Sequence, residues 1–116
     1  MKELTISAIE NLLEAECLMS QMANLVMQFG GDFWESPYSK AHKYHSDTVF
    51  AICTKNAKNL DNEEKMAIAQ DIFFECVFQL ARRKPVDIEI EDDNGNLCDV
   101  IRIATAEDMY NYFTKL

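Results

Sequence analysis

The segment from residue 86 to 91 constrains the fold of this chain more than any other feature. Apolar and acidic side chains alternate there without exception, which is the period of a β-strand with one buried face. Asn94-Gly95 follows closely, and this dipeptide is the strongest short signal for a hairpin turn. With a two-residue turn, Ile88 lies opposite Ile101 and apolar side chains meet across the strands. The sequence therefore predicts a β-hairpin at roughly 86–103.

The two faces of the predicted hairpin differ in charge. Asp87, Glu89 and Glu91 share the polar face, and Arg102 opposite Asp87 is its only counter-charge. Two strands alone are marginally stable in water. The hairpin must therefore pack on helices, take a third strand or pair across a dimer. Its apolar face consists of Val86, Ile88, Ile90, Ile101 and Ile103.

Helical periodicity dominates the N-terminal part of the chain. Ser7 and Glu10 match a capping box at the start of a helix that Gly30-Gly31 would end. Apolar side chains cover well over half of its circumference, so it needs cover on two sides. We expect either a central helix or a helix in a dimer interface. Its carboxylates, Glu16 among them, are expected to be solvated or to cap helix ends.

A second helix is predicted from Ser36-Pro37 to about Lys58. Serine is a favoured N-cap, and proline is favoured at the first helical position. Ser46-Asp47 could cap a fresh start and so divide this helix. Residues 48–54 are rich in β-branched and aromatic side chains, which makes a strand the competing interpretation. We favour the helix there.

Two more helices complete the predicted fold. Asp61 and Glu64 make a second capping-box pattern, and Pro85 ends the helix that follows. Thr105 is placed to cap a short final helix. We therefore expect an α+β fold with about three longer helices, the hairpin and a short C-terminal helix. At this length a single globular domain over residues 1–116 is expected.

The charge of the chain limits its partners. It has 116 residues, of which 20 are acidic and 11 basic, giving a net charge of -9. Nucleic-acid binding depends largely on Lys and Arg that neutralise phosphates, and anionic membranes attract basic segments, so we expect neither partner. The balance favours another protein with a basic surface. No signal peptide is evident, and four scattered cysteines suit reduced thiols in the cytoplasm.

No motif for catalysis or metal binding is complete. The chain has no glycine-rich phosphate loop, no Gly-x-Ser-x-Gly and no Cys-x2-Cys. His42 and His45 have a spacing that could share zinc with Cys53, but no zinc motif surrounds them. The turn at 92–96 partly matches a calcium loop, yet isoleucines stand where its first and last carboxylates are required. We predict no enzyme, no catalytic residue, no metal and no cofactor.

The acidic hairpin and an aromatic loop are the candidate surfaces for binding a partner. Spaced carboxylates on a rigid ribbon could dock on a basic cleft, as a nuclease inhibitor would; the alternative is a solvated face that protects an edge strand. The aromatic loop could anchor an interface, or it could close over the helical core. The residues predicted to bind a partner are Asp87, Glu89, Glu91, Asp92, Asp93, Trp34 and Tyr38.

These features favour a small acidic protein-binding domain. We expect a stoichiometric inhibitor of the kind that includes immunity and anti-defence proteins, acting on a target with a basic site. The first alternative is a homo-oligomer, such as a homodimer, with a structural or adaptor role. The second is a small ligand- or metal-binding protein with a pocket near Trp34, Tyr38, His42 and His45.

Overall fold

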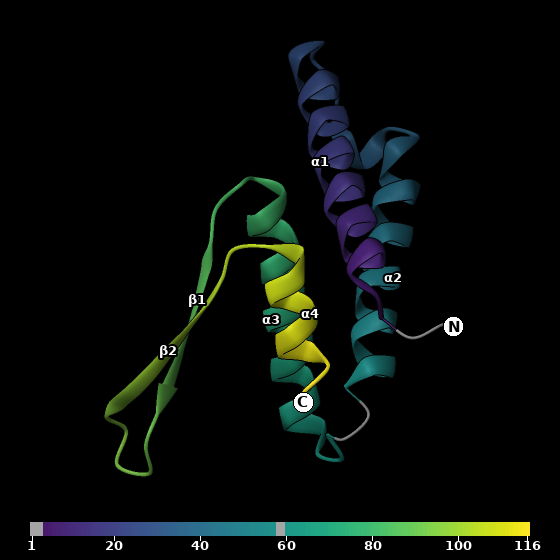
Figure 1. Ribbon diagram of the computed structural model, residues 1–116. Helices are drawn as coiled ribbons and strands as arrows, with labels where there is room; N and C mark the ends of the chain where they lie inside the picture. Colours follow the sequence, from purple (N-terminus) through teal and green to yellow (C-terminus); the bar gives the residue numbers. More distant parts are fainter. Residues whose placement is uncertain (1–3, 58–59) are drawn as a thin grey trace.

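The computed structural model describes residues 4–57 and 60–116 and confirms the α+β fold. Three long helices precede a two-stranded antiparallel hairpin, and a short helix follows it (Figure 1). One turn of 3-10 helix lies between the first two long helices. The elements are α1 (Ile6–Gln28), η1 (Phe33–Glu35), α2 (Tyr38–Asn56), α3 (Glu63–Ala81), β1 (Val86–Glu91), β2 (Leu97–Ile103) and α4 (Ala106–Phe113).

Two of the predicted helix starts are displaced by one or two residues. α1 is capped by the Thr5 hydroxyl, so the predicted cap at Ser7 is wrong. α3 is capped by the side chain of Asn62, and the predicted cap at Asp61 is wrong too. In both cases a nearby side chain of similar capping ability adopts the extended backbone that an N-cap needs. Thr105 caps α4 as predicted, in a capping box.

α2 is one unbroken helix. Residues 48–54 are helical, which confirms the favoured interpretation over a strand, and the helix continues through Ser46-Asp47. It ends at Asn56, and the predicted end at Lys58 lies outside the described residues.

The start of α2 agrees with the prediction only in part. Pro37 has helical backbone angles, as expected for a proline at a helix start. Ser36 makes no side-chain cap, because its hydroxyl donates to the Phe33 carbonyl instead (2.6 Å). That bond holds η1 against the beginning of α2.

α1 and α3 end in the same left-handed turn. Gly30 and Arg83 have φ values of 77° and 60°, and the two N–H groups after each helix donate back to it in the pattern of a Schellman motif. Glycine takes this conformation easily because it has no Cβ, whereas arginine is strained in it. The sequence predicted the first stop from Gly30-Gly31. Pro85 marked the second stop, but the left-handed arginine carried no signal.

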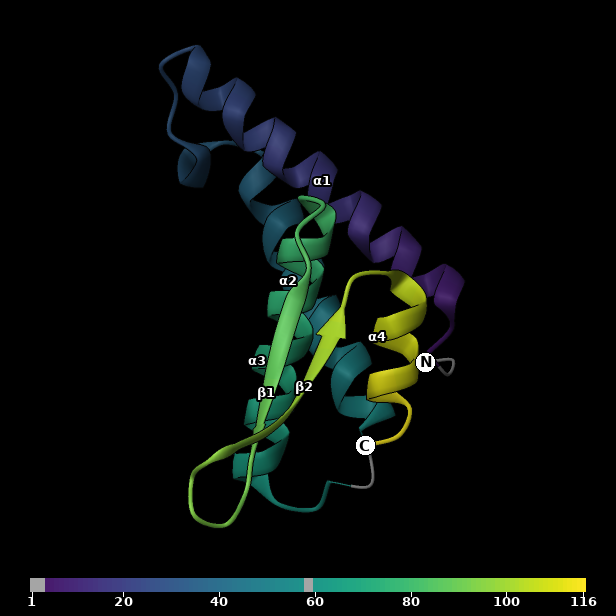
Figure 2. The ribbon, with the colours of Figure 1, turned by 60° about the vertical axis from the view of Figure 1, so that its left-hand side comes forward.

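The core lies where the three long helices, α4 and the base of the hairpin meet. Figure 2 shows the hairpin lying over α3, with α4 beside β2. Phe73 and Phe113 are almost completely buried and pack edge to face, with ring centroids 4.8 Å apart. Ile103 at the end of β2 has no exposed surface. The hairpin therefore leans on the helices, which is one of the three solutions that the sequence left open.

The hairpin register is as predicted near its base, and its turn differs. The predicted pairs, Ile88 with Ile101 among them, are present. The register shifts after Ile90, so β2 carries one extra residue there. A hydrogen bond of 2.8 Å between the two flanking residues closes a loop over 93–95, with Gly95 at φ 80°. The loop thus has three residues instead of the predicted two, because the glycine serves as the left-handed residue after the turn.

Two parts of the chain project from the core. These are the hairpin and the C-terminal end of α1 with η1, and they lie at opposite ends of the molecule in both views (Figures 1 and 2). The molecule measures 50 × 31 × 26 Å, and its radius of gyration is 15.8 Å. A compact chain of this length would have about 13 Å. The excess reflects the elongated shape that these two projecting parts produce.

Candidate functional site

The outer part of the hairpin leaves the helices. Val86, Ile88 and Ile101 pack against the core, and Ile103 belongs to it; these four residues form the hairpin root. Residues 89–100, here called the hairpin arm, lie beyond the root and have largely exposed side chains. Figure 1 shows the arm diverging from α3 and α4 toward the turn.

Asp87 is already neutralised within the hairpin. Its two carboxylate oxygens accept hydrogen bonds from Nε and one terminal nitrogen of Arg102, at 2.9 and 3.1 Å. The hydrogen bond and the charge of Arg102 hold the pKa of Asp87 below its usual range. Because this pair satisfies itself, Asp87 is a poor candidate for contact with a basic partner.

Two further carboxylates stabilise the backbone of the arm. Asp92 accepts hydrogen bonds from the N–H groups of Asn94 and Asn96, both at 2.9 Å, and so fixes the turn. Asp99 accepts from the Val100 N–H at 2.8 Å. The Asp92 carboxylate is therefore occupied by the backbone of the turn.

Three of the predicted carboxylates remain unpaired. Glu89, Glu91 and Asp93 are exposed and make no ion pair or side-chain hydrogen bond within the described ranges. Val100 lies opposite Glu89 across the strands, and Leu97 near the turn is 58% exposed. The arm therefore combines unpaired carboxylates with exposed apolar side chains.

Trp34 and Tyr38 lie at the other end of the molecule. They belong to η1 and the start of α2, so the structure does not bring them together with the acidic residues (Figure 1). Trp34 is 69% exposed, which is incompatible with the alternative of a lid over the core. Its ring packs edge to face with Phe33 and His42, at centroid distances of 5.3 and 5.5 Å. The aromatic side chains form a small surface cluster.

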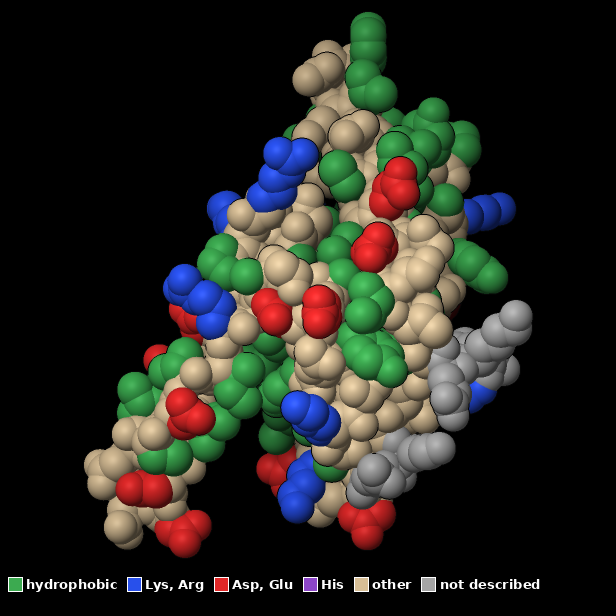
Figure 3. All heavy atoms as spheres, viewed as in Figure 1, with side chains coloured by type: hydrophobic (Ala, Val, Ile, Leu, Met, Phe, Trp, Pro, Cys, Tyr) green, Lys and Arg blue, Asp and Glu red, His purple; other side chains and the backbone are tan. Residues whose placement is uncertain are grey.

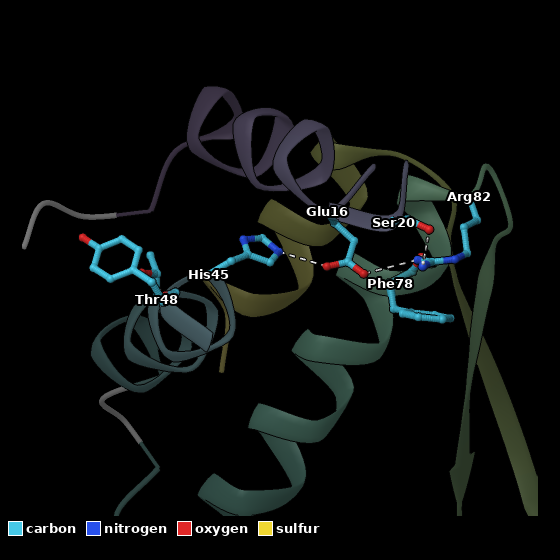
Figure 4. Close-up of polar contacts among 7 residues, drawn as sticks. Glu16, Ser20, His45, Thr48, Phe78 and Arg82 are labelled. Atoms are coloured by element: carbon cyan, nitrogen blue, oxygen red, sulfur yellow. Dashed lines mark hydrogen bonds and ion pairs between the residues drawn. The ribbon is translucent and has the colours of Figure 1, made fainter. Parts of the chain in front are cut away.

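The structure contains a partly buried polar network that the sequence did not reveal. Glu16 on α1 accepts from His45 Nε2 on α2 at 2.9 Å and from Arg82 at the end of α3 at 3.4 Å (Figure 4). Arg82 also donates to the Ser20 hydroxyl at 3.2 Å. We call these four residues the polar clamp. Glu16 is buried, so its predicted place among solvated carboxylates is wrong.

The polar clamp favours the charged form of Glu16. The hydrogen bond from His45 lowers the pKa of the Glu16 carboxyl, and Arg82 adds to the effect, so that together they outweigh the opposing effect of burial. Arg82 is itself held in place, since its guanidinium lies 3.5 Å from the centroid of the Phe78 ring and donates to the Phe78 carbonyl. The clamp ties three helices together and leaves its groups satisfied.

A surface hollow of about 370 Å³ adjoins the clamp. Phe33, Trp34, His42 and Arg82 contribute to its lining. His42 faces the aromatic cluster and His45 faces Glu16, so the two histidines do not converge. Within residues 4–57 and 60–116, no three His, Cys, Asp or Glu side chains are grouped to hold a metal ion.

The buried thiols are poor nucleophiles. Burial raises the pKa of Cys53 to about 11, and burial with the nearby Glu75 charge raises that of Cys76 to about 12. Both thiols are therefore protonated at neutral pH, whereas a catalytic cysteine works as the thiolate.

Comparison with protein-family models, with curated proteins and with solved structures finds no match to this chain. No helix in the described ranges has the length and apolar character needed to cross a membrane. Function must therefore be inferred from the chain's own residues. These form two projecting surfaces of different chemistry.

Proposed function

We propose that this chain is a small protein-binding domain whose hairpin arm docks on a basic surface of another protein. The observation that carries the proposal is the projection of the arm with Glu89, Glu91 and Asp93 unpaired on it. Carboxylates that served solubility alone could be spread over the helices. Here three unpaired carboxylates stand together on an element that projects from the body, where a cleft in a partner can receive them.

The arm can attract a basic target electrostatically and then make apolar contacts with it after docking. Unpaired carboxylates accelerate encounter with a basic surface and oppose acidic partners. The exposed side chains of Leu97 and Val100 lie opposite Glu91 and Glu89 across the strands and can be buried on docking. This combination of a polar rim around apolar contacts is typical of protein interfaces.

Steric occlusion of a basic site is the mechanism that this geometry supports best. Such proteins act as stoichiometric inhibitors, and the immunity and anti-defence types belong to this class. Trp34 and Tyr38 lie at the opposite end of the molecule from the arm, so we do not place them in this interface. All four cysteines are free, which suits a reducing compartment such as the cytoplasm.

The test begins with the protein purified gently from its own source at low salt. Native mass spectrometry of the complex identifies the bound protein, which we expect to be basic. Association rates are then measured against salt concentration for the double variant Glu89→Gln/Glu91→Gln. We expect slower association and a flatter salt dependence, because two steering charges are removed.

The matched control is Glu10→Gln/Asp71→Asn, which removes the same charge from exposed sites on α1 and α3. We expect this control to retain most of the wild-type association rate. If both double variants change the rate equally, only net charge matters and the arm is not the interface. If neither changes it at low salt, the proposal fails.

A further inference from the structure

α1 carries a second surface that the chain leaves uncovered. From Cys17 to Gly31 there is no charged residue, although the chain as a whole has a net charge of -9. Four of the large apolar side chains in this segment recur at spacings of four, three and four residues, which places these four on one face of the helix. We call this face the apolar stripe; it consists of Leu18, Met22, Leu25 and Phe29.

The apolar stripe faces away from the core. The buried residues of α1, Ile9, Leu12 and Glu16, lie on the opposite side of the helix. Leu18 is 47% exposed and Leu25 is 53% exposed, although both lie in the interior of a long helix, and Met22 between them is half-buried. Phe29 at the helix end is 87% exposed. Figure 3 shows hydrophobic side chains gathered at this upper tip of the molecule.

We propose that the apolar stripe pairs with the same stripe of a second copy of this chain, in an antiparallel, two-fold symmetric dimer. The four-three-four spacing is the pattern by which helices pack on one another along a seam. In a two-fold interface, each residue meets a partner position that meets it in return. Antiparallel pairing sets Leu18 against Phe29 of the second copy and Met22 against its Leu25.

The distribution of charge favours a second copy as the occupant. Two chains that each carry -9 repel each other at most orientations, and the segment 17–31 adds no like charge to this repulsion. A basic partner would find no carboxylate in this segment. A lipid surface is disfavoured, because helices that lie on membranes carry Lys or Arg on the polar face and this segment has none.

Charge also favours the antiparallel direction. Glu14 lies one turn before Leu18, close to the same side of the helix, and it is exposed. Parallel pairing would bring Glu14 of the two copies together at the start of the seam. Antiparallel pairing places each Glu14 beyond the helix end of the other copy, so the like charges stay apart.

This dimer does not depend on the function proposed for the hairpin arm. The arm and the stripe lie at opposite ends of the molecule, so the dimer leaves both arms accessible. A seam of four side chains per copy is smaller than the ~800 Å² per partner of a standard interface. We therefore expect a dimer that dissociates on dilution.

The first test measures the mass of the intact protein by sedimentation equilibrium over a wide dilution series. We expect wild type to pass from dimer to monomer on dilution. Leu25→Glu places a charge in the seam and should raise the dissociation constant by at least about tenfold. The matched control, Asn24→Glu, adds the same charge one residue away, off the stripe, and should dimerise nearly as wild type does.

The second test checks the direction of pairing. Leu25→Glu chains are mixed with Met22→Lys chains, each of which is expected to be mainly monomeric alone. Antiparallel pairing brings the two new opposite charges into contact, so the mixture should form heterodimers. Parallel pairing would not bring them together.

Several results would overturn the proposal. A wild-type protein that is monomeric at every concentration rules out the dimer. Equal dimerisation of Leu25→Glu and Asn24→Glu, with helix content unchanged by circular dichroism, moves the interface elsewhere. Binding of the monomer to phosphatidylcholine vesicles through Leu25 would assign the stripe to lipid instead. Failure of the charge-swapped mixture to associate rules out the antiparallel arrangement.

Discussion

The two projecting ends of the molecule use opposite chemistry. The hairpin arm presents unpaired carboxylates among exposed apolar side chains, whereas residues 17–31 present apolar side chains and no charge. Charged groups act over distances up to about 8 Å in physiological salt, while apolar burial acts only at contact. The arm is therefore suited to capturing a distant partner of opposite charge, and α1 to holding a surface that is already close.

The two ends are also fastened differently. The arm continues from the hairpin root, whose Ile103 is buried among apolar side chains. α1 is joined to α2 and α3 by the polar clamp, after which its last turns extend past the body. One end thus relies on hydrophobic packing and the other on buried hydrogen bonds as well.

The hairpin root and the hairpin arm should differ most in stability. Ile103→Ala removes a side chain with no exposed surface, so we expect the free energy of unfolding to fall by about 2–5 kcal/mol. Ile90→Ala removes the same atoms from a partly exposed position beyond the root and should cost less than about 1 kcal/mol. Urea denaturation measures both. Equal losses would mean that the arm is part of the core and cannot act as a separate element.

The polar clamp should matter nearly as much as the hairpin root. Glu16→Ala leaves His45 and Arg82 without their buried acceptor, and we expect a loss of about 2–3 kcal/mol. The control Glu14→Ala, at an exposed position of the same helix, should change stability by less than about 0.5 kcal/mol. If the two variants lose the same amount in urea denaturation, the clamp does not hold α1 to its neighbours.

The hairpin and the polar clamp differ in how well the sequence predicts them. The hairpin was predictable because its period of two and its turn signal agree over a short stretch of chain. In the clamp, Glu16 contacts His45 and Arg82, which lie 29 and 66 positions farther along the chain. No local sequence pattern therefore indicates the clamp. One signal was present: Glu16 falls on the buried face of α1, with Ile9 and Leu12. A carboxylate there requires buried partners, which the sequence alone does not name.

The candidate site was predictable in position and not in detail. Alternation placed Asp87, Glu89 and Glu91 on one face of the hairpin, as the register confirms near its base. Which carboxylates are free depends on side-chain geometry, and only the structure shows that Arg102 and the turn backbone occupy Asp87 and Asp92. The three-residue loop was missed because Asn-Gly serves turns of both lengths.

The clamp should also give the protein an acid-sensitive step. Because the folded-state pKa of Glu16 lies below its usual value of 4.5, its contribution to stability is present above that value. The contribution is lost as pH falls from 4.5 through the lower folded-state pKa. Glu16→Gln does not titrate, so its free energy of unfolding should fall less steeply over this range. Urea denaturation at a series of pH values measures the slopes, and parallel slopes would contradict the assignment.

The ends of α1 and α3 have the same left-handed backbone conformation, but glycine occupies it in α1 and arginine in α3. Exchanging these residue types should have the smallest effect. A left-handed residue with a Cβ is strained by about 1–2 kcal/mol, and glycine relieves this strain while losing some entropy on folding. Arg83→Gly should therefore stabilise the protein by less than about 1 kcal/mol, whereas Gly30→Ala should destabilise it by about 1 kcal/mol. A Cβ at Gly30 meets no atom within 4 Å, so a loss there reports backbone conformation and not a clash. Effects of the same sign in thermal denaturation would show that the two helix ends are not equivalent.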